Sequence, residues 1–428
     1  MKRLLTDRLV EWKSSKHRKP LILHGARQVG KTWLMKDFGE RFYSDTAYID
    51  FNNNARMKSL FEGDFDIPRL IEGLQAECRK KITPGETLLI FDEVQEVPLA
   101  LTSLKYFYEN APEYHIIAGG SLLGVSLHSG TSFPVGKVDF LDLYPLNFTE
   151  FLCGIGEGQL ADILKNRDWS LITAFKSKYI DYLRKYYFVG GMPESVTIYT
   201  EERDYKAVRT VQNAILLAYD QDFSKHVPKD TIAKVRSVWN NIPRLLAREN
   251  KRFSPGVIQK GSRLKDYENA IQWLSDAGLI YQVECVSKPG IPLKNYTDGA
   301  FKIYAHDVGL LSCMAEIDAR TLLEGNSIFT EFKGSLTEQY VCSELKQCGI
   351  TPYYWSSEHT AEVDFVFKKD RDILPLEVKA EENLKAKSLK LYSEKYNPVT
   401  AVRTSMSDYR KDDWLTNVPL YAIGGWLG

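Results

Sequence analysis

Five short runs of β-prone residues are separated by longer amphipathic stretches between Leu21 and Glu150. The runs are LILH (21–24), TAYIDF (46–51), TLLIFDE (87–93), YHIIAGG (114–120) and KVDFLDL (137–143). The segments between them are long enough for crossover helices, and this alternation is typical of a parallel sheet with helices on both faces. Residues 1–155 are therefore predicted to form one α/β domain.

The loop after the first run carries the pattern G-x-x-x-x-G-K-[ST]. It lies between a predicted strand and the helix that contains WLMKDF, which is where a phosphate-binding loop has to lie. Its glycines let the loop fold back so that the amides point toward phosphates, and its lysine adds a positive charge at the β and γ positions. ATP is therefore the predicted cofactor, and Lys31 is also a predicted catalytic residue. The predicted nucleotide-binding residues are Gly25, Ala26, Arg27, Gln28, Val29, Gly30, Lys31 and Thr32.

Two acidic residues, Asp92 and Glu93, end the apolar strand 88–91. Asp92 and the Thr32 hydroxyl are predicted to hold Mg²⁺, and Glu93 to polarise the water that attacks the γ-phosphate. The pair favours hydrolysis over binding alone. Ser121, which follows the next strand, either senses the γ-phosphate or caps a helix that starts at Leu122.

The middle of the chain is helical and then basic. Residues 156–228 are predicted to form a helical connector around a Gly-Gly-Met-Pro break, and residues 229–288 follow the element order of a winged helix-turn-helix. The segment from Lys229 to Asp266 contains ten basic and three acidic residues. The whole chain, in contrast, has 56 basic and 56 acidic residues and no formal net charge. DNA is the predicted partner, and a winged helix that packs only on protein is the alternative. The candidate phosphate contacts are Arg236, Arg244, Arg248, Lys251, Arg252, Lys260, Arg263 and Lys265.

Residues 289–428 show a second α/β pattern, in which Asp364 precedes Glu377-Val378-Lys379 by thirteen residues. Side chains at i and i+2 of a strand share a face, so Glu377 and Lys379 are predicted to point to one site. Asp364 and Glu377 are candidate Mg²⁺ ligands, and Lys379 is a candidate to orient or deprotonate water. These three residues are predicted catalytic residues of a nuclease-like site. In the alternative, Lys379 simply pairs with a carboxylate.

These motifs together resemble the bacterial and archaeal family of AAA-type ATPases that carry a C-terminal domain of unknown function with a nuclease-like fold. The runs that carry the resemblance are LHGARQVGKT, IFDEVQ, AGGSLL, GKVDFLDLYPLNFTEF, GGMPE, EVDFVF and LPLEVKA. The resemblance implies an AAA ATPase domain, a winged-helix middle and a restriction-endonuclease-like C-terminal domain, with Glu338 as a further carboxylate. It also suggests a homo-oligomeric ring.

One position departs from the family pattern, because Gly136-Lys137 stands where members usually have Gly-Arg. A lysine lacks the planar fork of an arginine finger, so Lys137 is either a weaker finger or a solvated lysine at a strand end. Arg184 and Arg209 remain open as fingers.

Other classes of protein are excluded by simple features. The balanced charge excludes a polycation, and six scattered cysteines predict neither disulfides nor a zinc site. His306 and Asp307 are too few for a metal site. No run of 18 uncharged apolar residues occurs, so a cytoplasmic protein without a membrane span is predicted.

Overall fold

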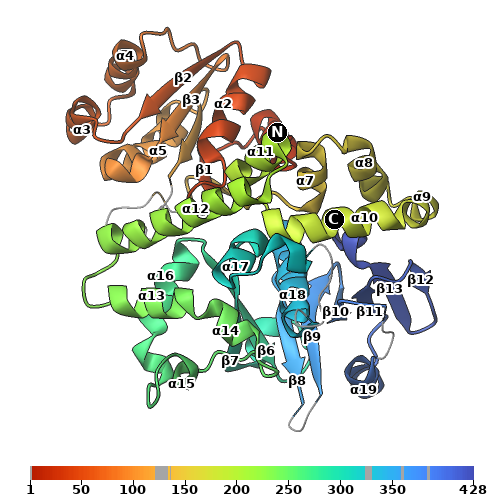
Figure 1. Cartoon of the computed structure of the whole chain (residues 1–428). Coiled ribbons are helices and arrows are strands. Elements are labelled where there is room, and N and C mark those ends of the chain that lie inside the picture. Colours follow the sequence, from red (N-terminus) through yellow and green to blue (C-terminus); the bar gives the residue numbers. More distant parts are fainter. Residues whose placement is uncertain (1, 121–133, 135, 323–329, 358–360, 383–385) are drawn as a thin grey trace. The chain divides into compact units, whose positions relative to one another are not determined.

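The computed structural model describes residues 2–120, 134, 136–322, 330–357, 361–382 and 386–428 (Figure 1). They divide into two compact units. One comprises Lys2–Tyr144 with Asp276–Gly278, and the other comprises Pro145–Ser275 with Leu279–Gly428. Ser121 lies outside the described residues. Among the described residues, we find no helix whose length and apolar character would let it cross a membrane.

The N-terminal unit is built on a five-stranded sheet with the order β2-β3-β4-β1-β5. Every neighbouring pair is parallel, so the predicted parallel α/β domain is confirmed. Each of the five predicted runs overlaps one strand. The strands are β1 (Leu21–His24), β2 (Asp45–Asp50), β3 (Thr87–Asp92), β4 (His115–Gly119) and β5 (Asp139–Asp142).

Helices cover both faces of this sheet. The face covered by α3–α5 carries a hydrophobic core in which Phe61 and Phe107 pack around Phe91 of β3. Asn54 and Asp66 cap α3 and α4 with their side chains. The helices are α1 (Leu5–Ser14), α2 (Lys31–Phe42), α3 (Ala55–Glu62), α4 (Ile67–Cys78) and α5 (Pro98–Asn110), with the 3₁₀ helix η1 (Val94–Glu96).

The second unit opens with the predicted helical region. Asn147 and Glu150 form a capping box at its first helix. The Gly-Gly-Met-Pro break separates α10 from α11, and a Cβ on Gly191 would lie 2.0 Å from the carbonyl oxygen of Leu146. The helices are α7 (Phe148–Gly154), α8 (Gly158–Asn166), α9 (Trp169–Ala174), α10 (Lys176–Val189), α11 (Pro193–Glu202) and α12 (Tyr205–His226).

The basic segment has several short helices followed by two strands, and the winged helix-turn-helix stays a prediction. Trp239 and Trp273 are buried. The strands β6 and β7 pair antiparallel. The elements are α13 (Ile232–Asn240), α14 (Ile242–Leu246), α15 (Pro255–Ile258), η2 (Leu264–Asp266), α16 (Glu268–Asp276), β6 (Ile280–Val286), η3 (Leu293–Tyr296) and β7 (Thr297–Ala305).

The remaining strands extend this hairpin into an eight-stranded sheet with the order β12-β13-β11-β10-β9-β8-β6-β7. The strands β8, β9 and β10 form an antiparallel meander, and β10 pairs parallel with β11. The strands are β8 (Tyr353–Ser356), β9 (Glu362–Lys369), β10 (Asp372–Val378), β11 (Ala401–Ser405), β12 (Arg410–Lys411) and β13 (Leu415–Pro419).

Helices border this sheet as well. Trp355 and Val363 pack against Leu389 and Tyr392 of α19, while neighbouring residues of β9 point to the other face. The helices are α17 (Val308–Met314), α18 (Thr330–Gln347), α19 (Lys387–Tyr396), η6 (Leu420–Ala422) and α20 (Ile423–Leu427). Because β6 pairs with β8, the predicted boundary between residues 288 and 289 falls between strands of one sheet. The four-part division into 1–155, 156–228, 229–288 and 289–428 stays a prediction.

Candidate functional site

The predicted phosphate loop joins the end of β1 to the start of α2. Gly25 and Gly30 have φ angles of +152° and +93°, values that L side chains rarely adopt. A Cβ on Gly25 would also lie 2.2 Å from the carbonyl oxygen of Leu143. Both glycines are therefore required by the backbone path of the loop.

Lys31 is buried at the start of α2, and its ammonium folds back into the loop. Its Nζ donates to the carbonyl oxygens of Gly25 at 2.8 Å and Ala26 at 2.7 Å. Burial lowers the pKa of Lys31 to about 8, although the nearby carboxylates of Glu93 and Asp92 act in the opposite direction. The loop thus holds a cation in a place where its charge is poorly solvated, and an incoming phosphate would stabilise that charge.

Asp92 ends β3 directly beside the phosphate loop. The Thr32 hydroxyl donates to Asp92 Oδ2 at 2.7 Å, so the two predicted magnesium ligands are in contact. The Tyr48 hydroxyl donates to the same oxygen at 3.0 Å. Burial raises the pKa of Asp92, and these two hydrogen bonds oppose the rise. Sequence reasoning missed Tyr48, whose only signal is its place in the strand that pairs with β3.

Glu93 has a left-handed backbone, with φ +51° and ψ +42°. Such a conformation in a residue other than glycine is held by its surroundings and is enriched at functional sites. Gln95 Nε2 donates to Glu93 Oε2 at 2.5 Å, which fixes the carboxylate. Gln95 is a second residue that the sequence motifs did not indicate.

Two of the three candidate fingers, Lys137 and Arg209, make contacts with other residues of the chain. Lys137 pairs with Glu109 of α5 at 3.0 Å, inside its own unit. Arg209 donates to the Gln212 side chain and to the carbonyl oxygen of Ile317. Both residues are therefore bound to other groups of the same chain, and which residue acts as the arginine finger stays a prediction.

Asp364 and Glu377 lie on the neighbouring strands β9 and β10. The last pair of the antiparallel register is Leu376 with Phe365, so the next residues along the two strands, Glu377 and Asp364, are opposed on the same face. The amide of Val378 donates to Asp364 Oδ2 at 2.7 Å. The predicted carboxylate pair is thus brought together.

The two oxygens of Glu377 have different surroundings. Lys379 Nζ donates to Oε1 at 2.6 Å, whereas Oε2 is buried and accepts no hydrogen bond within the described structure. Burial raises the pKa of Glu377, and burial with the charges of Glu338 and Glu377 raises the pKa of Asp364 well above its ordinary value. Burial therefore disfavours the ionised forms of both carboxyl groups.

Glu338 of α18, the further carboxylate implied by the resemblance, belongs to the same buried cluster but is already engaged. Lys251 Nζ donates to Oε1, and the Tyr304 hydroxyl donates to Oε2 at 3.1 Å. Lys302 lies 4.0 Å from Oε2. Within the described ranges, no group of three or more His, Cys, Asp or Glu side chains is arranged to hold a metal ion.

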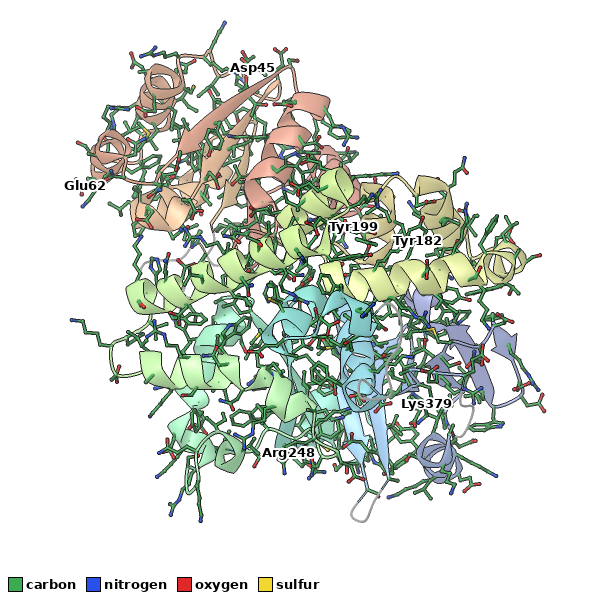
Figure 2. All side chains as sticks on the ribbon, in the orientation of Figure 1. Asp45, Glu62, Tyr182, Tyr199, Arg248 and Lys379 are labelled. Carbon is green, nitrogen blue, oxygen red and sulfur yellow. The ribbon has the colours of Figure 1, made fainter. Side chains whose placement is uncertain are left out.

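Two of the eight predicted phosphate contacts are used in internal ion pairs. Arg236 donates to both carboxylate oxygens of Asp220, at 2.6 and 2.8 Å, and Lys251 is bound to Glu338. Five others are exposed, and Arg248 is labelled among them in Figure 2. The exposed residues are Arg244, Arg248, Lys260, Arg263 and Lys265. His306 and Asp307 contact protein groups: Tyr219 for the histidine, and the amides of Gly191 and Leu310 for the aspartate.

Comparisons with known proteins bear on the N-terminal unit first. Residues 17–152 match the family model described as an AAA domain. This part of the chain is similar to AAA domains. Residues 180–321 match a domain of unknown function (DUF8612), and residues 333–423 match another (DUF4143). Because both are domains of unknown function, these matches do not test the predicted winged helix or the predicted nuclease-like fold.

Three solved structures are similar to this chain at low sequence identity. The Walker-type ATPase PABY2304 of Pyrococcus abyssi is 17% identical, covers 73% of this chain and 95% of its own, and has a TM-score of 0.45. The Orc1 protein of Aeropyrum pernix, solved with DNA, is 13% identical over 73% and 90%, with a TM-score of 0.24. Cdc6p of Pyrobaculum aerophilum is 12% identical over 75% and 92%, with a TM-score of 0.22. No curated protein matches.

Proposed function

We propose that the protein binds and hydrolyses ATP with Mg²⁺, and that its nucleotide state controls a DNA-binding basic segment and a nuclease-like carboxylate site. The observation that carries the ATPase part is the Thr32–Asp92 hydrogen bond of 2.7 Å, which joins the phosphate loop to the end of β3. This is the arrangement in which a P-loop hydroxyl and a strand-end aspartate share one magnesium ion.

In this proposal each residue of the AAA-type domain has a separate task. The loop amides and Lys31 bind the β- and γ-phosphates, while Thr32 and Asp92 hold the metal, which neutralises phosphate charge when it is bound. Glu93, fixed by Gln95, accepts the proton of the attacking water. Ser121 stays a candidate γ-phosphate sensor.

In this proposal the carboxylate site binds one divalent cation. Glu377 Oε2 is a buried oxygen without a donor, and it lies beside the carboxylate of Asp364 on the next strand. A buried carboxylate oxygen without a partner is costly, and a metal ion is one group that can satisfy it. In the proposed function Asp364 and Glu377 bind Mg²⁺ and Lys379 orients the water that attacks a phosphodiester. The metal supplies Lewis acidity when it is bound.

A second candidate function is a nucleotide-switched scaffold that acts on a protein partner with a C-terminal domain that does not cut. The engagement of Arg236 and Lys251 in internal ion pairs favours it, as does the pairing of Lys379 with Glu377. Under this alternative the carboxylates are a retained binding surface. The cytoplasmic location and the homo-oligomeric state also stay proposals.

ATP turnover in Mg²⁺ separates the two candidates when it is measured with duplex, forked and single-stranded DNA. The wild type is compared with Lys31→Ala. Stimulation by one DNA form that is lost in the variant supports a DNA-coupled ATPase. Turnover that responds to none of the DNA forms favours the protein-partner switch.

The nuclease part has its own assay, in which the protein is incubated with DNA and Mn²⁺. Cleavage by the wild type and its loss in Asp364→Ala support the proposed site. Cleavage that persists in the variant points to a contaminant, and an inactive wild type favours a binding role.

A further inference from the structure

Tyr48 of β2 points its hydroxyl at the aspartate that ends the neighbouring strand. β2 and β3 are parallel, with Tyr48 opposite Ile90, so Asp92 lies two residues farther along β3 on the same face of the sheet. The Tyr48 hydroxyl donates to Asp92 Oδ2 at 3.0 Å, and the Thr32 hydroxyl donates to the same oxygen at 2.7 Å. One carboxylate oxygen therefore receives two hydroxyl donors, one from the start of α2 and one from β2.

The other oxygen of Asp92 is engaged as well. Its Oδ1 accepts the backbone amide of Glu93 at 3.1 Å, and Glu93 is the residue with the left-handed backbone that serves as the base in the proposed function. The donors around a carboxylate set its orientation. The orientation of Asp92 is thus tied both to Thr32 and to the backbone of Glu93.

Tyr48 is itself held by a lysine of α2, the helix that lies against β2 and β3 (Figure 1). The Nζ of Lys36 lies 3.7 Å from the centroid of the Tyr48 ring, and a cation on the face of a ring is attracted by the ring quadrupole. Lys36 and Thr32 are four residues apart in α2, so their side chains lie on one face of the helix. The tyrosine is therefore fixed at its ring by Lys36 and at its hydroxyl by Asp92.

We propose that Tyr48 is a positioning residue of the ATP site, which holds Asp92 in the orientation in which it shares the Mg²⁺ of the nucleotide with Thr32. The inference rests on the proposed ATPase function. A second donor, supplied from a strand, limits the rotation that one hydroxyl donor would leave to the carboxylate. Loss of the Tyr48 hydroxyl leaves the charge of Asp92 in place but frees its side chain to turn. The effect therefore falls on metal binding, while the phosphate contacts of the loop and Lys31 stay intact.

The test is the affinity of the full chain for a fluorescent, non-hydrolysable ATP analogue, measured in saturating Mg²⁺ and in EDTA. Tyr48→Phe keeps the ring and its contact with Lys36 and removes only the hydroxyl. We expect its affinity in EDTA to equal that of the wild type. The gain in affinity from Mg²⁺ should fall about tenfold, as is found when partners of metal ligands are removed. A gain equal to that of the wild type overturns the proposal.

Tyr43→Phe is the matched control. Tyr43 follows the last residue of α2, at the end of the helix that is far from the phosphate loop, and its hydroxyl is hydrogen-bonded to the His115 ring at 2.7 Å. The substitution thus removes a tyrosine hydroxyl bond of the same kind from the same unit. We expect a similar change in thermal unfolding and an unchanged gain from Mg²⁺. If Tyr43→Phe lowers the gain as much as Tyr48→Phe does, the effect is one of stability and the proposal fails.

A double-mutant cycle tests the contribution of Lys36. Lys36→Met removes the cation and keeps an unbranched side chain, and we expect it to lower the gain from Mg²⁺ about threefold, the value of a cation–π contact. Because Lys36 acts through the Tyr48 hydroxyl, it should cause no further loss when Tyr48→Phe is already present. Losses that add would show that Lys36 acts on the nucleotide by itself, and its part in the proposal would be wrong.

Asp92→Asn separates a failure of this inference from a failure of the proposed function. The wild type must bind the analogue more tightly with Mg²⁺, and Asp92→Asn must lose that gain; otherwise the metal role of Asp92 is wrong and the inference falls with it. If both conditions hold and Tyr48→Phe behaves as the wild type, the inference alone is wrong. In ATP turnover, raised Mg²⁺ should restore most of the activity of Tyr48→Phe by mass action. Turnover that stays low at every Mg²⁺ concentration contradicts a role through metal binding.

Discussion

We expect nucleotide affinity to depend on pH between 7 and 9, because the pKa of Lys31 is lowered to about 8. Burial lowers its pKa to about 8 in the free protein, and the bound phosphates require its charged form. The protonated fraction is nearly complete at pH 7 and is lost as the pH rises through 8. The dissociation constant for ATP is multiplied by 1 + 10^(pH − pKa), so it should rise about tenfold, or about 1.4 kcal/mol, between pH 7 and pH 9.

Equilibrium titration with a fluorescent ATP analogue at pH 7, 8 and 9, with excess Mg²⁺ and constant ionic strength, measures this change. Lys31→Met is the control, because it should bind more weakly and with no such dependence on pH. An affinity of the wild type that varies less than about twofold over this range would refute the claim that the phosphate meets a partly deprotonated lysine.

Three other predictions concern the loop, the base and the basic segment. Glu93→Gln should leave nucleotide affinity near normal and lower ATP turnover at least about a hundredfold; unchanged turnover removes Glu93 from catalysis. Gly25→Ala places a Cβ 2.2 Å from the Leu143 carbonyl oxygen and should abolish ATP binding or folding, whereas Gly158→Ala, with open space around it, should be neutral in thermal unfolding. DNA affinity should fall as salt rises, and Arg248→Gln should lower the slope of log affinity against log salt by about one; a slope that does not change excludes a phosphate contact there.

The N-terminal domain could be predicted from sequence because its signals are local. Each strand of its sheet coincides with a β-prone run, and the phosphate loop follows directly from the order of strand, glycine-rich loop and helix. The contact between Thr32 and Asp92 could also be anticipated, since parallel strands end at one edge of a sheet. In contrast, Tyr48 reaches Asp92 from a strand whose position at the sheet edge depends on long-range pairing.

The C-terminal sheet was predicted only in part for the same reason. β11 is a fully buried strand, although three of the five residues in its sequence AVRTS are polar. Arg403 and Ser405 can be buried because both donate hydrogen bonds to the side chain of Asn417 in β13. The pattern of apolar and polar residues in the sequence does not predict such a strand. The burial of Lys302 could not be predicted either. A single lysine in a strand is expected to be exposed unless carboxylate partners are known.

The end of the N-terminal unit is held against the phosphate loop. The amide of Leu143 donates to the His24 carbonyl oxygen at 2.7 Å, and Gly25 packs against the Leu143 carbonyl. Arg3 donates from one guanidinium to the carbonyl oxygens of Val29 in the loop and Tyr144 at the end of the unit. Both ends of the phosphate loop are thus bonded to residues 143 and 144.

The chain continues from Tyr144 directly into the second unit, where its first residues are equally fixed. The amide of Leu146 donates to the Gly191 carbonyl at 2.7 Å, and the carbonyl of Leu146 accepts from the Tyr186 hydroxyl at 2.6 Å. In the proposed function, a rearrangement of the loop around phosphates would act first on residues 143 and 144, which belong to the same unit as the loop.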